Sequence, residues 1–246
     1  MHGDDIAGDI TTAMVLAAGL GKRMRPLTAD TPKPLVPVAG RTLLDRVLDR
    51  LVAGGVERAV VNVHYLGDQI IDAMATRGVP HIEISDERGE LLDTGGGIAN
   101  ALPLLGDGPF FVHNSDSIWI EGPENNLARM QRYWDDARMD CLMLLAMTTT
   151  STGYAGRGDF AMDPQGQLSR RGEHGVVPFV FTGVSIAHPR LFEGAPQGAF
   201  SLNQLWDRAM TAGRLYGLRL EGRWMHVGSP LGLAEAETAL AEADHA

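Results

Sequence analysis

The sequence is poor in cysteine and in long apolar stretches, and each shortage excludes a class of protein. Its single cysteine, Cys141, rules out an internal disulfide and a thiolate metal cluster. No apolar run reaches the length of a membrane-spanning helix, and the first residues are acidic, unlike the basic start of a signal peptide. We therefore expect a cytoplasmic protein that has no membrane partner.

Positive charge is also scarce. The 246 residues include 31 acidic and 21 basic side chains, which gives a net charge of -10. This balance argues against a nucleic-acid partner, because binding along a phosphate backbone needs a basic face. The only lysines are Lys22 and Lys33, and both lie in one short segment near the N-terminus. That segment is a local excess of positive charge in an acidic chain.

Strand and helix patterns alternate along the first part of the chain. Strand patterns occur at 12–18, 58–63, 81–85, 109–116 and 140–147, and helical patterns at 42–53, 68–77, 96–105 and 125–136. The alternation predicts an α/β fold with a Rossmann-like, mixed but mostly parallel central sheet flanked by helices.

The second part of the chain has more closely spaced strand patterns, but no Ser/Gly linker separates it from the first. We predict a flexible tail over residues 1–11 and a single domain over 12–246. Within that domain, residues 12–147 form a nucleotide-binding half and residues 148–246 form a substrate-binding half.

A glycine-rich, basic loop follows the first predicted strand. Gly19 and Gly21 permit a tight turn that presents backbone N–H groups to an anion, and Lys22 and Arg23 add positive charge. The loop is not a dinucleotide fingerprint, since Met24 stands where a third glycine is required, and it is not a P-loop, since Arg23 follows Lys22. The residues alone leave two interpretations open, a polyphosphate site and a solvated basic loop.

The sequence around this loop resembles the start of the sugar-1-phosphate nucleotidyltransferases. That family has Leu-x-x-Gly-x-Gly-x-Arg followed by Pro-Lys-Pro, and this chain has Leu16-Ala-Ala-Gly-Leu-Gly-Lys-Arg followed by Pro32-Lys-Pro. The similarity continues through Asp93-Thr-Gly-Gly-Gly, Asn114-Ser-Asp116, Phe181-Thr-Gly183 and Trp224-Met-His-Val-Gly228, so it covers nearly the whole chain. Length and details are most similar to the N-acetylmuramate-1-phosphate uridylyltransferases, with mannose-1-phosphate guanylyltransferases as near relatives.

The resemblance implies a nucleotidyltransferase fold and a reaction that makes an NDP-sugar and pyrophosphate. A sugar-phosphate oxygen attacks the α-phosphorus of a nucleoside triphosphate, and the protein mainly positions the reactants and neutralises charge. The implied partners are UTP or another NTP and a sugar 1-phosphate, closest to N-acetylmuramate 1-phosphate in cell-wall recycling; no oligomeric state is predicted. Two alternatives stay open: GTP with mannose 1-phosphate or another hexose 1-phosphate, and a noncatalytic regulator that binds a nucleotide sugar.

The family's motifs also imply roles for individual residues. Arg23 corresponds to the arginine that contacts the leaving pyrophosphate, Lys33 to the lysine on the reacting phosphates, and Asp116 to the metal-binding aspartate, so these three are the predicted catalytic residues. The predicted nucleotide-binding residues are Leu16, Ala17, Ala18, Gly19, Gly21, Arg23, Lys33, Thr94, Gly95, Gly96 and Asn114. The predicted sugar-phosphate-binding residues are Asn114, Gly158, Asp159, Thr182 and Gly183.

The sequence departs from the family at two points. His226 stands where the late motif Trp-x-Asp-Val-Gly has aspartate. Asp116 and His226 are the predicted metal ligands; Mg²⁺ is the expected cofactor, and Mn²⁺ or Co²⁺ stays open because imidazole suits softer ions. His226 contacting phosphate, or only packing under the sheet, are the alternatives. The chain also has no lysine after Lys33, so Arg170, Arg171 or no residue replaces the lysine that holds the sugar phosphate in many relatives.

Overall fold

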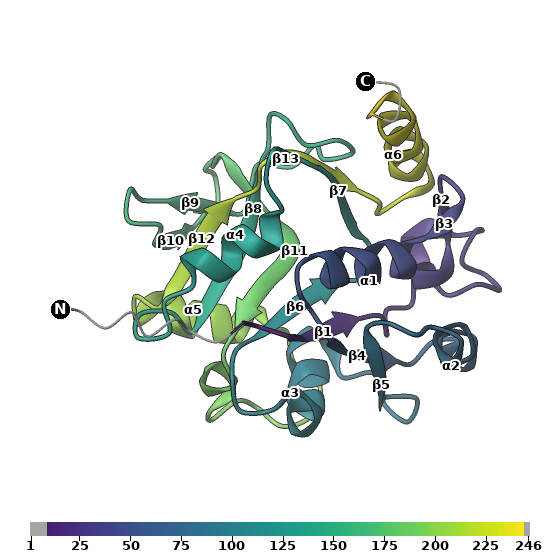
Figure 1. The fold of residues 1–246 in the computed structure, drawn as a ribbon. Helices are drawn as coiled ribbons and strands as arrows, with labels where there is room; N and C mark the ends of the chain where they lie inside the picture. The colour runs from purple at the N-terminus through teal and green to yellow at the C-terminus, as the bar shows by residue number, and fades with distance from the viewer. Residues whose placement is uncertain (1–8, 244–246) are drawn as a thin grey trace.

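A nine-stranded sheet forms the centre of the computed structural model, which describes residues 9–243 (Figure 1). Four of its strands run parallel to one another in the order β6, β1, β4 and β5, which are Phe110–Asn114, Thr12–Leu16, Arg58–Val63 and His81–Asp86. The helices α1, α2 and α3 that follow β1, β4 and β5 are Leu43–Ala53, Gly67–Ala75 and Asp93–Leu105. The carboxyl ends of these strands therefore meet at one edge of the sheet, where open α/β sheets bind their ligands.

The other strands of the large sheet mix directions. They are β8 (Cys141–Met147), β9 (Phe160–Met162), β10 (Leu168–Arg170), β11 (Phe179–Ala187) and β12 (Leu215–Arg219). β11 pairs antiparallel with β6, β8 and β9, whereas β12 pairs parallel with β8. β11 therefore lies between β6 and β8, two strands that precede it in the sequence. The sheet confirms the predicted α/β fold with a mixed, mostly parallel sheet.

Two small sheets and short helical turns complete the molecule. β7 (Ser117–Glu121) pairs antiparallel with β13 (Gly222–His226), and β2 (Pro37–Val38) pairs with β3 (Arg41–Thr42). The remaining helices are α4 (Asn126–Tyr133), α5 (Asn203–Thr211) and α6 (Pro230–Ala243). The proline-rich segment 31–37 contains one 3₁₀ turn at Lys33–Leu35. Proline is tolerated there because the first turn of a helix needs no N–H from it.

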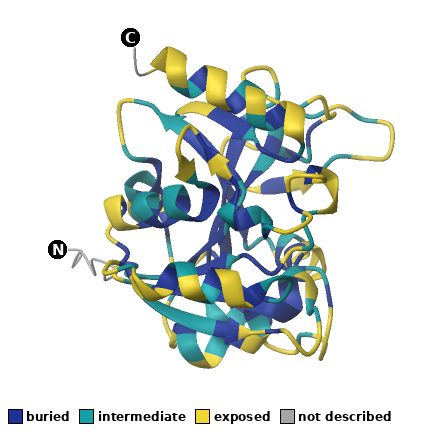
Figure 2. Ribbon diagram, turned by 90° about the vertical axis from the view of Figure 1, so that its right-hand side faces the viewer, coloured by how far each residue is buried: buried dark blue, intermediate teal, exposed yellow. Residues whose placement is uncertain are grey.

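Helices cover both faces of the sheet. Side chains of α1 and α2, such as Leu48 and Ile70, are buried against one face, and Ile98 of α3 and Leu205 of α5 against the other. Figure 2 shows the buried residues running through the middle of the molecule and the exposed ones on its outer helices and loops. Cys141 lies fully buried in this core, and burial raises the pKa of its thiol to about 12, as expected of an inert cysteine.

The ends of the chain are only partly described. Residues 1–8 of the expected tail lie outside the described residues, so that prediction stands untested for them. Ile10, by contrast, is buried, and its N–H donates to the side chain of Gln131 at 2.8 Å. Over residues 9–243, no helix combines the length and the apolar character needed to cross a membrane.

Candidate active site

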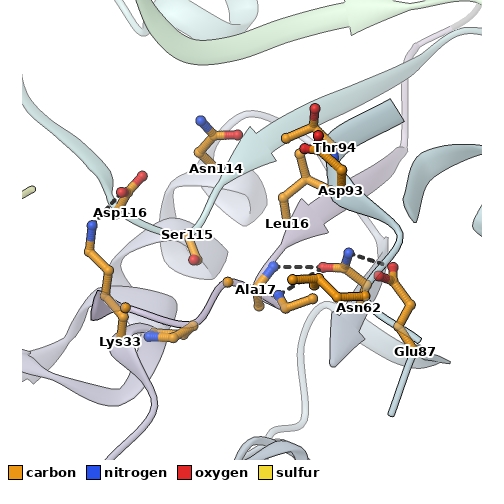
Figure 3. A pocket seen from close by; sticks show the side chains of 15 residues that line it. Leu16, Ala17, Lys33, Asn62, Glu87, Asp93, Thr94, Asn114, Ser115 and Asp116 are labelled. Carbon is orange, nitrogen blue, oxygen red and sulfur yellow. Dashed lines mark hydrogen bonds and ion pairs between the residues drawn. The ribbon is translucent and has the colours of Figure 1, made fainter. Parts of the chain in front are cut away.

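A pocket of about 280 Å³ opens at the carboxyl ends of β1, β4 and β6 (Figure 3). Five separate segments converge on it: the loop after β1, the Pro-Lys-Pro turn, Asn62 of β4, the segment from Glu87 to Thr94 and the end of β6. The residues predicted to bind nucleotide that line it are Leu16, Ala17, Ala18, Gly19, Gly21, Lys33, Thr94 and Asn114, together with the predicted catalytic residue Asp116. The structure therefore brings together most of the nucleotide side of the predicted site.

A second hollow, of about 400 Å³, shares Lys33 and Asp116 with this pocket and is lined by Lys22 and Arg23. The loop turns into it at Gly21, which has a left-handed backbone with φ 60°. A Cβ on Gly21 would lie 3.2 Å from the side chains of Lys33 and Thr28, so the turn also needs the space that glycine leaves. Arg23, the remaining predicted catalytic residue, thus faces the same space as Lys33 and Asp116.

Lys33 and Asp116 form an ion pair where the two hollows meet. The Lys33 ammonium donates to Asp116 Oδ2 at 2.5 Å, and Figure 3 shows the two side chains pointing toward each other. Burial by itself would raise the pKa of Asp116, but the charge and hydrogen bond of Lys33, with His226 and Arg23 nearby, hold it below its ordinary value. Asp116 is therefore an ionised carboxylate at neutral pH.

His226 reaches this centre through a strand pairing between distant parts of the chain. It is the last residue of β13 and lies opposite Ser117, the neighbour of Asp116. Its ring covers Gly228, where a Cβ would lie 2.3 Å from His226 Nε2. Burial lowers the pKa of His226, although the Asp116 charge opposes that shift, so the imidazole is neutral at pH 7.

The acidic and imidazole side chains at this centre are too few to enclose a metal ion alone. Among residues 9–243, no three His, Cys, Asp or Glu side chains are grouped so as to hold one. Asp116 and His226 are nevertheless neighbours, as the sequence predicted for the two candidate ligands. A divalent cation that uses one or two protein ligands and takes its remaining oxygens from substrate phosphates and water fits this arrangement.

Sequence reasoning missed two buried polar residues in the wall of the nucleotide pocket. Asn62 Oδ1 accepts hydrogen bonds from the N–H groups of Ala17 (2.7 Å) and Ala18 (3.3 Å), and its Nδ2 donates to Glu87 Oε1 at 2.7 Å (Figure 3). These two backbone N–H groups therefore bind the protein's own side chain. An asparagine inside the apolar strand Val60–Val63 was the signal in the sequence.

Glu87 is 2% exposed, and its other oxygen accepts from the N–H of Leu92 at 3.3 Å. Burial raises the pKa of this carboxyl, which its partners only partly offset. Its carbonyl also pairs with His64 Nδ1 at 2.6 Å, so the segment around Glu87 is tied to the strand ends. Asn62 and Glu87 thus fix the shape of the pocket wall from behind.

The glycine trio Gly95–Gly97 lies in the first turn of a helix. α3 begins at Asp93 rather than at Gly96, and the N–H groups of Gly95 and Gly96 donate to the carbonyl of Phe200 at 2.9 and 3.1 Å. A Cβ on Gly95 would lie 2.3 Å from the Phe200 ring, and one on Gly96 2.3 Å from the carbonyl of Gly198. These glycines serve packing, and only Thr94 of the predicted segment lines the pocket.

The sugar side of the predicted site lies beside a third hollow, of about 450 Å³. It is lined by Asp159, Phe160, Arg170, Arg171, Phe181, Asn203 and Trp206. Gly183, two residues after the lining residue Phe181, lies against the nucleotide pocket, because a Cβ there would lie 2.9 Å from Asn114 Nδ2. Gly158, with φ 79°, precedes Asp159 and donates its N–H to Tyr154 Oη at 3.1 Å.

Thr182 is the predicted sugar-side residue whose side chain points elsewhere. It is 1% exposed, and its hydroxyl donates to the carbonyl of Leu144 at 2.8 Å. Its own carbonyl accepts from the hydroxyl of Ser117. Thr182 therefore joins β11 to the strands beside it, and its side chain does not line the hollow.

Comparisons with known proteins relate the chain to nucleotidyltransferases. Residues 13–144 match the family model described as the MobA-like NTP transferase domain. The chain is 50% identical to the N-acetylmuramate alpha-1-phosphate uridylyltransferase of Caulobacter vibrioides, over 94% of this chain and 97% of that protein. It is 35% identical to the protein of the same name from Neisseria meningitidis serogroup B, over 92% and 96%. The crystal structure of HddC from Yersinia pseudotuberculosis, at 22% identity, has the same fold, with a TM-score of 0.76 over 94% of this chain and all of that one (100%).

Proposed function

The chain belongs to the predicted family, the sugar-1-phosphate nucleotidyltransferases, and we propose that it transfers a uridylyl group from UTP to N-acetylmuramate α-1-phosphate. The names of the two relatives support this choice of base and sugar, and they share nearly their full length with this chain. The products would be UDP-N-acetylmuramate and pyrophosphate. The proposed place of this reaction is the recycling of cell-wall sugars.

The observation that carries the proposal is the Lys33–Asp116 ion pair at the junction of the hollows. A strand end, a proline-flanked turn and a basic loop converge there, and Arg23 faces the same space. Transfer at a phosphorus atom asks a protein mainly to align two reactants and to neutralise their charge. Two cations and one ionised carboxylate at the meeting point of two pockets suit that task.

Each proposed role follows from the position of a side chain. Arg23, in the glycine-rich loop, would hold the β- and γ-phosphates that leave as pyrophosphate, a task for which a planar guanidinium is well shaped. Lys33 lies deeper, paired with Asp116, and its compact ammonium would neutralise the oxygens of the reacting phosphates. Asn114 lies between the nucleotide pocket and Gly183, so it would orient the incoming sugar phosphate.

A divalent cation is proposed to be held by Asp116, with His226 as the second candidate ligand and substrate phosphates completing the shell. Bound there, such an ion would neutralise the negative charge of the reacting phosphates. Mg²⁺ is the first candidate, and the neutral imidazole of His226 keeps Mn²⁺ and Co²⁺ as alternatives. The ion pair with Lys33 keeps the carboxylate of Asp116 ionised and thus ready to bind a cation.

The sugar side would use backbone groups and one carboxylate. Gly158 and Gly183 both have left-handed backbones, which shape the chain beside the third hollow. Asp159 Oδ2 accepts from the N–H of Phe181 at 3.0 Å, which fixes the carboxylate in the wall of that hollow. Its remaining lone pairs would accept hydroxyl groups of the sugar.

The test is a matrix of four nucleoside triphosphates against several sugar 1-phosphates, scored for released pyrophosphate with Mg²⁺ and with Mn²⁺. We expect UTP with N-acetylmuramate α-1-phosphate to give the highest kcat/KM. A maximum at GTP with mannose 1-phosphate would favour the guanylyltransferase alternative. Nucleotide binding without pyrophosphate from any pair would instead identify a noncatalytic regulator and refute the enzyme.

A further inference from the structure

The third hollow contains an arginine whose charge no described carboxylate neutralises. Arg171 Nε donates to the carbonyl of Gly158 at 3.0 Å, and Nη1 contacts the carbonyls of Gly172 and Glu173 at 3.3 Å. It forms no ion pair within residues 9–243. Arg170 beside it differs, because it forms an ion pair with Asp207.

Carbonyl oxygens hold the Arg171 guanidinium in place but do not cancel its charge. Its Nη2 group makes none of the hydrogen bonds found among the described residues, so a donor edge is left for a ligand. Guanidinium groups with such an edge bind carboxylates strongly, since the two planar groups match in geometry and charge.

The rest of this hollow suits the ring of a sugar. Phe160, Phe181 and Trp206 provide an apolar wall, and the rings of Phe181 and Trp206 meet edge to face with centroids 4.9 Å apart. Apolar and aromatic walls with a few fixed polar groups are typical of small-molecule pockets. Asp159 and Arg171 are such groups here, one an acceptor and the other a donor.

The position of Arg171 argues against contact with the 1-phosphate. The adjacent Arg170 lies opposite Phe160, and Phe160 opposite Phe179. Phe179 precedes Gly183, which touches Asn114, by four residues, or about 13 Å along a strand. The 1-phosphate must lie near Lys33 and Asp116, so Arg171 faces another part of the sugar.

We propose that Arg171 selects acidic sugar 1-phosphates by pairing with a carboxylate carried on the sugar ring. The proposal rests on the proposed function, because it assumes that the third hollow receives the acceptor sugar. N-Acetylmuramate 1-phosphate has such a carboxylate in its lactyl ether, and N-acetylglucosamine 1-phosphate is the same sugar without it. The Arg171 contact makes this carboxylate the feature that distinguishes the two substrates.

The test compares these two sugar 1-phosphates with UTP, using the wild type, Arg171→Gln and the matched control Arg170→Gln. For Arg171→Gln we expect a loss of about 30-fold in kcat/KM on the acidic sugar, mainly through KM, and of less than about threefold on the neutral one. Arg170→Gln should leave the ratio of kcat/KM for the two substrates unchanged, because Asp207 already neutralises that arginine.

A neutral amide of the acidic sugar 1-phosphate supplies a second measurement. The wild type should use it about as poorly as N-acetylglucosamine 1-phosphate, and Arg171→Gln should hardly distinguish the acid from its amide. Equal losses on all sugars in Arg171→Gln would indicate a merely structural arginine and overturn the proposal. A wild type without preference for the acid would overturn it too, whereas a wild type inactive with every pair would refute the proposed function itself.

Discussion

The nucleotide pocket and the third hollow, on the sugar side, are built in different ways. In the nucleotide pocket, Asn62 is committed to backbone N–H groups of the loop after β1 and to Glu87. In the third hollow, Arg171 and Asp159 keep donor and acceptor groups that no described residue uses fully. Internal hydrogen bonds therefore fix the shape of the nucleotide pocket. The third hollow instead presents donor and acceptor groups that are available to a ligand.

This difference separates two consequences of substitution. A change in the frame of the nucleotide pocket disturbs folding and binding together, because the same hydrogen bonds support both. On the proposed function, a change in the third hollow should alter which sugar is accepted and leave the fold largely intact. The centre between them, at Lys33 and Asp116, should affect the chemical step most.

The largest effect is expected at that centre. Lys33→Arg should lower kcat by about 100-fold or more, because a bulkier guanidinium does not reproduce a point charge between phosphates. Nucleotide affinity, measured by titration without the sugar, should fall much less. Lys22→Arg is the matched control, since Lys22 is exposed and is assigned no role; it should change turnover less than about twofold. Near-normal turnover in Lys33→Arg would show that the reaction does not need a compact ammonium at this position.

The next largest effect is expected on stability, and it compares Asn62 in the nucleotide pocket with Asn203 in the third hollow. Asn62→Ala should lower the free energy of unfolding in urea by about 3 kcal/mol, because it leaves the buried N–H groups of Ala17 and Ala18 and the Oε1 atom of Glu87 without a partner. Asn203→Ala, in the wall of the third hollow and exposed, should cost less than about 1 kcal/mol. Similar losses for both variants would erase the proposed contrast.

A smaller effect is expected at His226, the candidate metal ligand at the end of β13. His226→Asp should shift the ratio of the rate with Mg²⁺ to the rates with Mn²⁺ and Co²⁺ toward Mg²⁺ by roughly fivefold, since carboxylate oxygen suits the harder ion. The measurement is pyrophosphate release with each metal in turn. Identical metal profiles in the two proteins would exclude His226 as a ligand.

The smallest effect concerns pH and the frame of the nucleotide pocket. Burial raises the pKa of Glu87 above its ordinary value of 4.5, so the folded protein binds this proton more tightly than the unfolded chain. Ionising Glu87 therefore weakens folding, and its contribution to stability should fall as the pH rises above 4.5. Urea unfolding of Glu87→Gln between pH 4.5 and 7 should show a smaller fall than the wild type. A steeper fall in the variant would contradict this sign.

Much of the nucleotide side could be predicted because its residues are close in sequence or end parallel strands. The alternation of strands and helices predicted the sheet, and the carboxyl ends of β1 and β6 then had to bring the loop near Asp116. The family and its enzyme class were also predicted from these short motifs.

The rest depended on contacts between distant segments. The early start of α3 is explained by the carbonyl of Phe200, and the approach of His226 to Asp116 by the pairing of β13 with β7. Neither partner is visible in the local sequence. Thr182 matched a motif correctly, yet the direction of its side chain is set by its hydrogen bond to the carbonyl of Leu144.

The position of β11 in the sheet limits how this chain can be divided into fragments. Residues 13–144 alone match the family model, which suggests a portable module. The sheet contradicts that impression, since β11, from the second half, is inserted between β6 and β8 of the first. A fragment cut after Met147 would leave one edge of β6 and both edges of β8 without a partner strand, and would invite aggregation. Chimeras that exchange sugar specificity between relatives should therefore graft the lining of the third hollow and keep β11 with its own sheet.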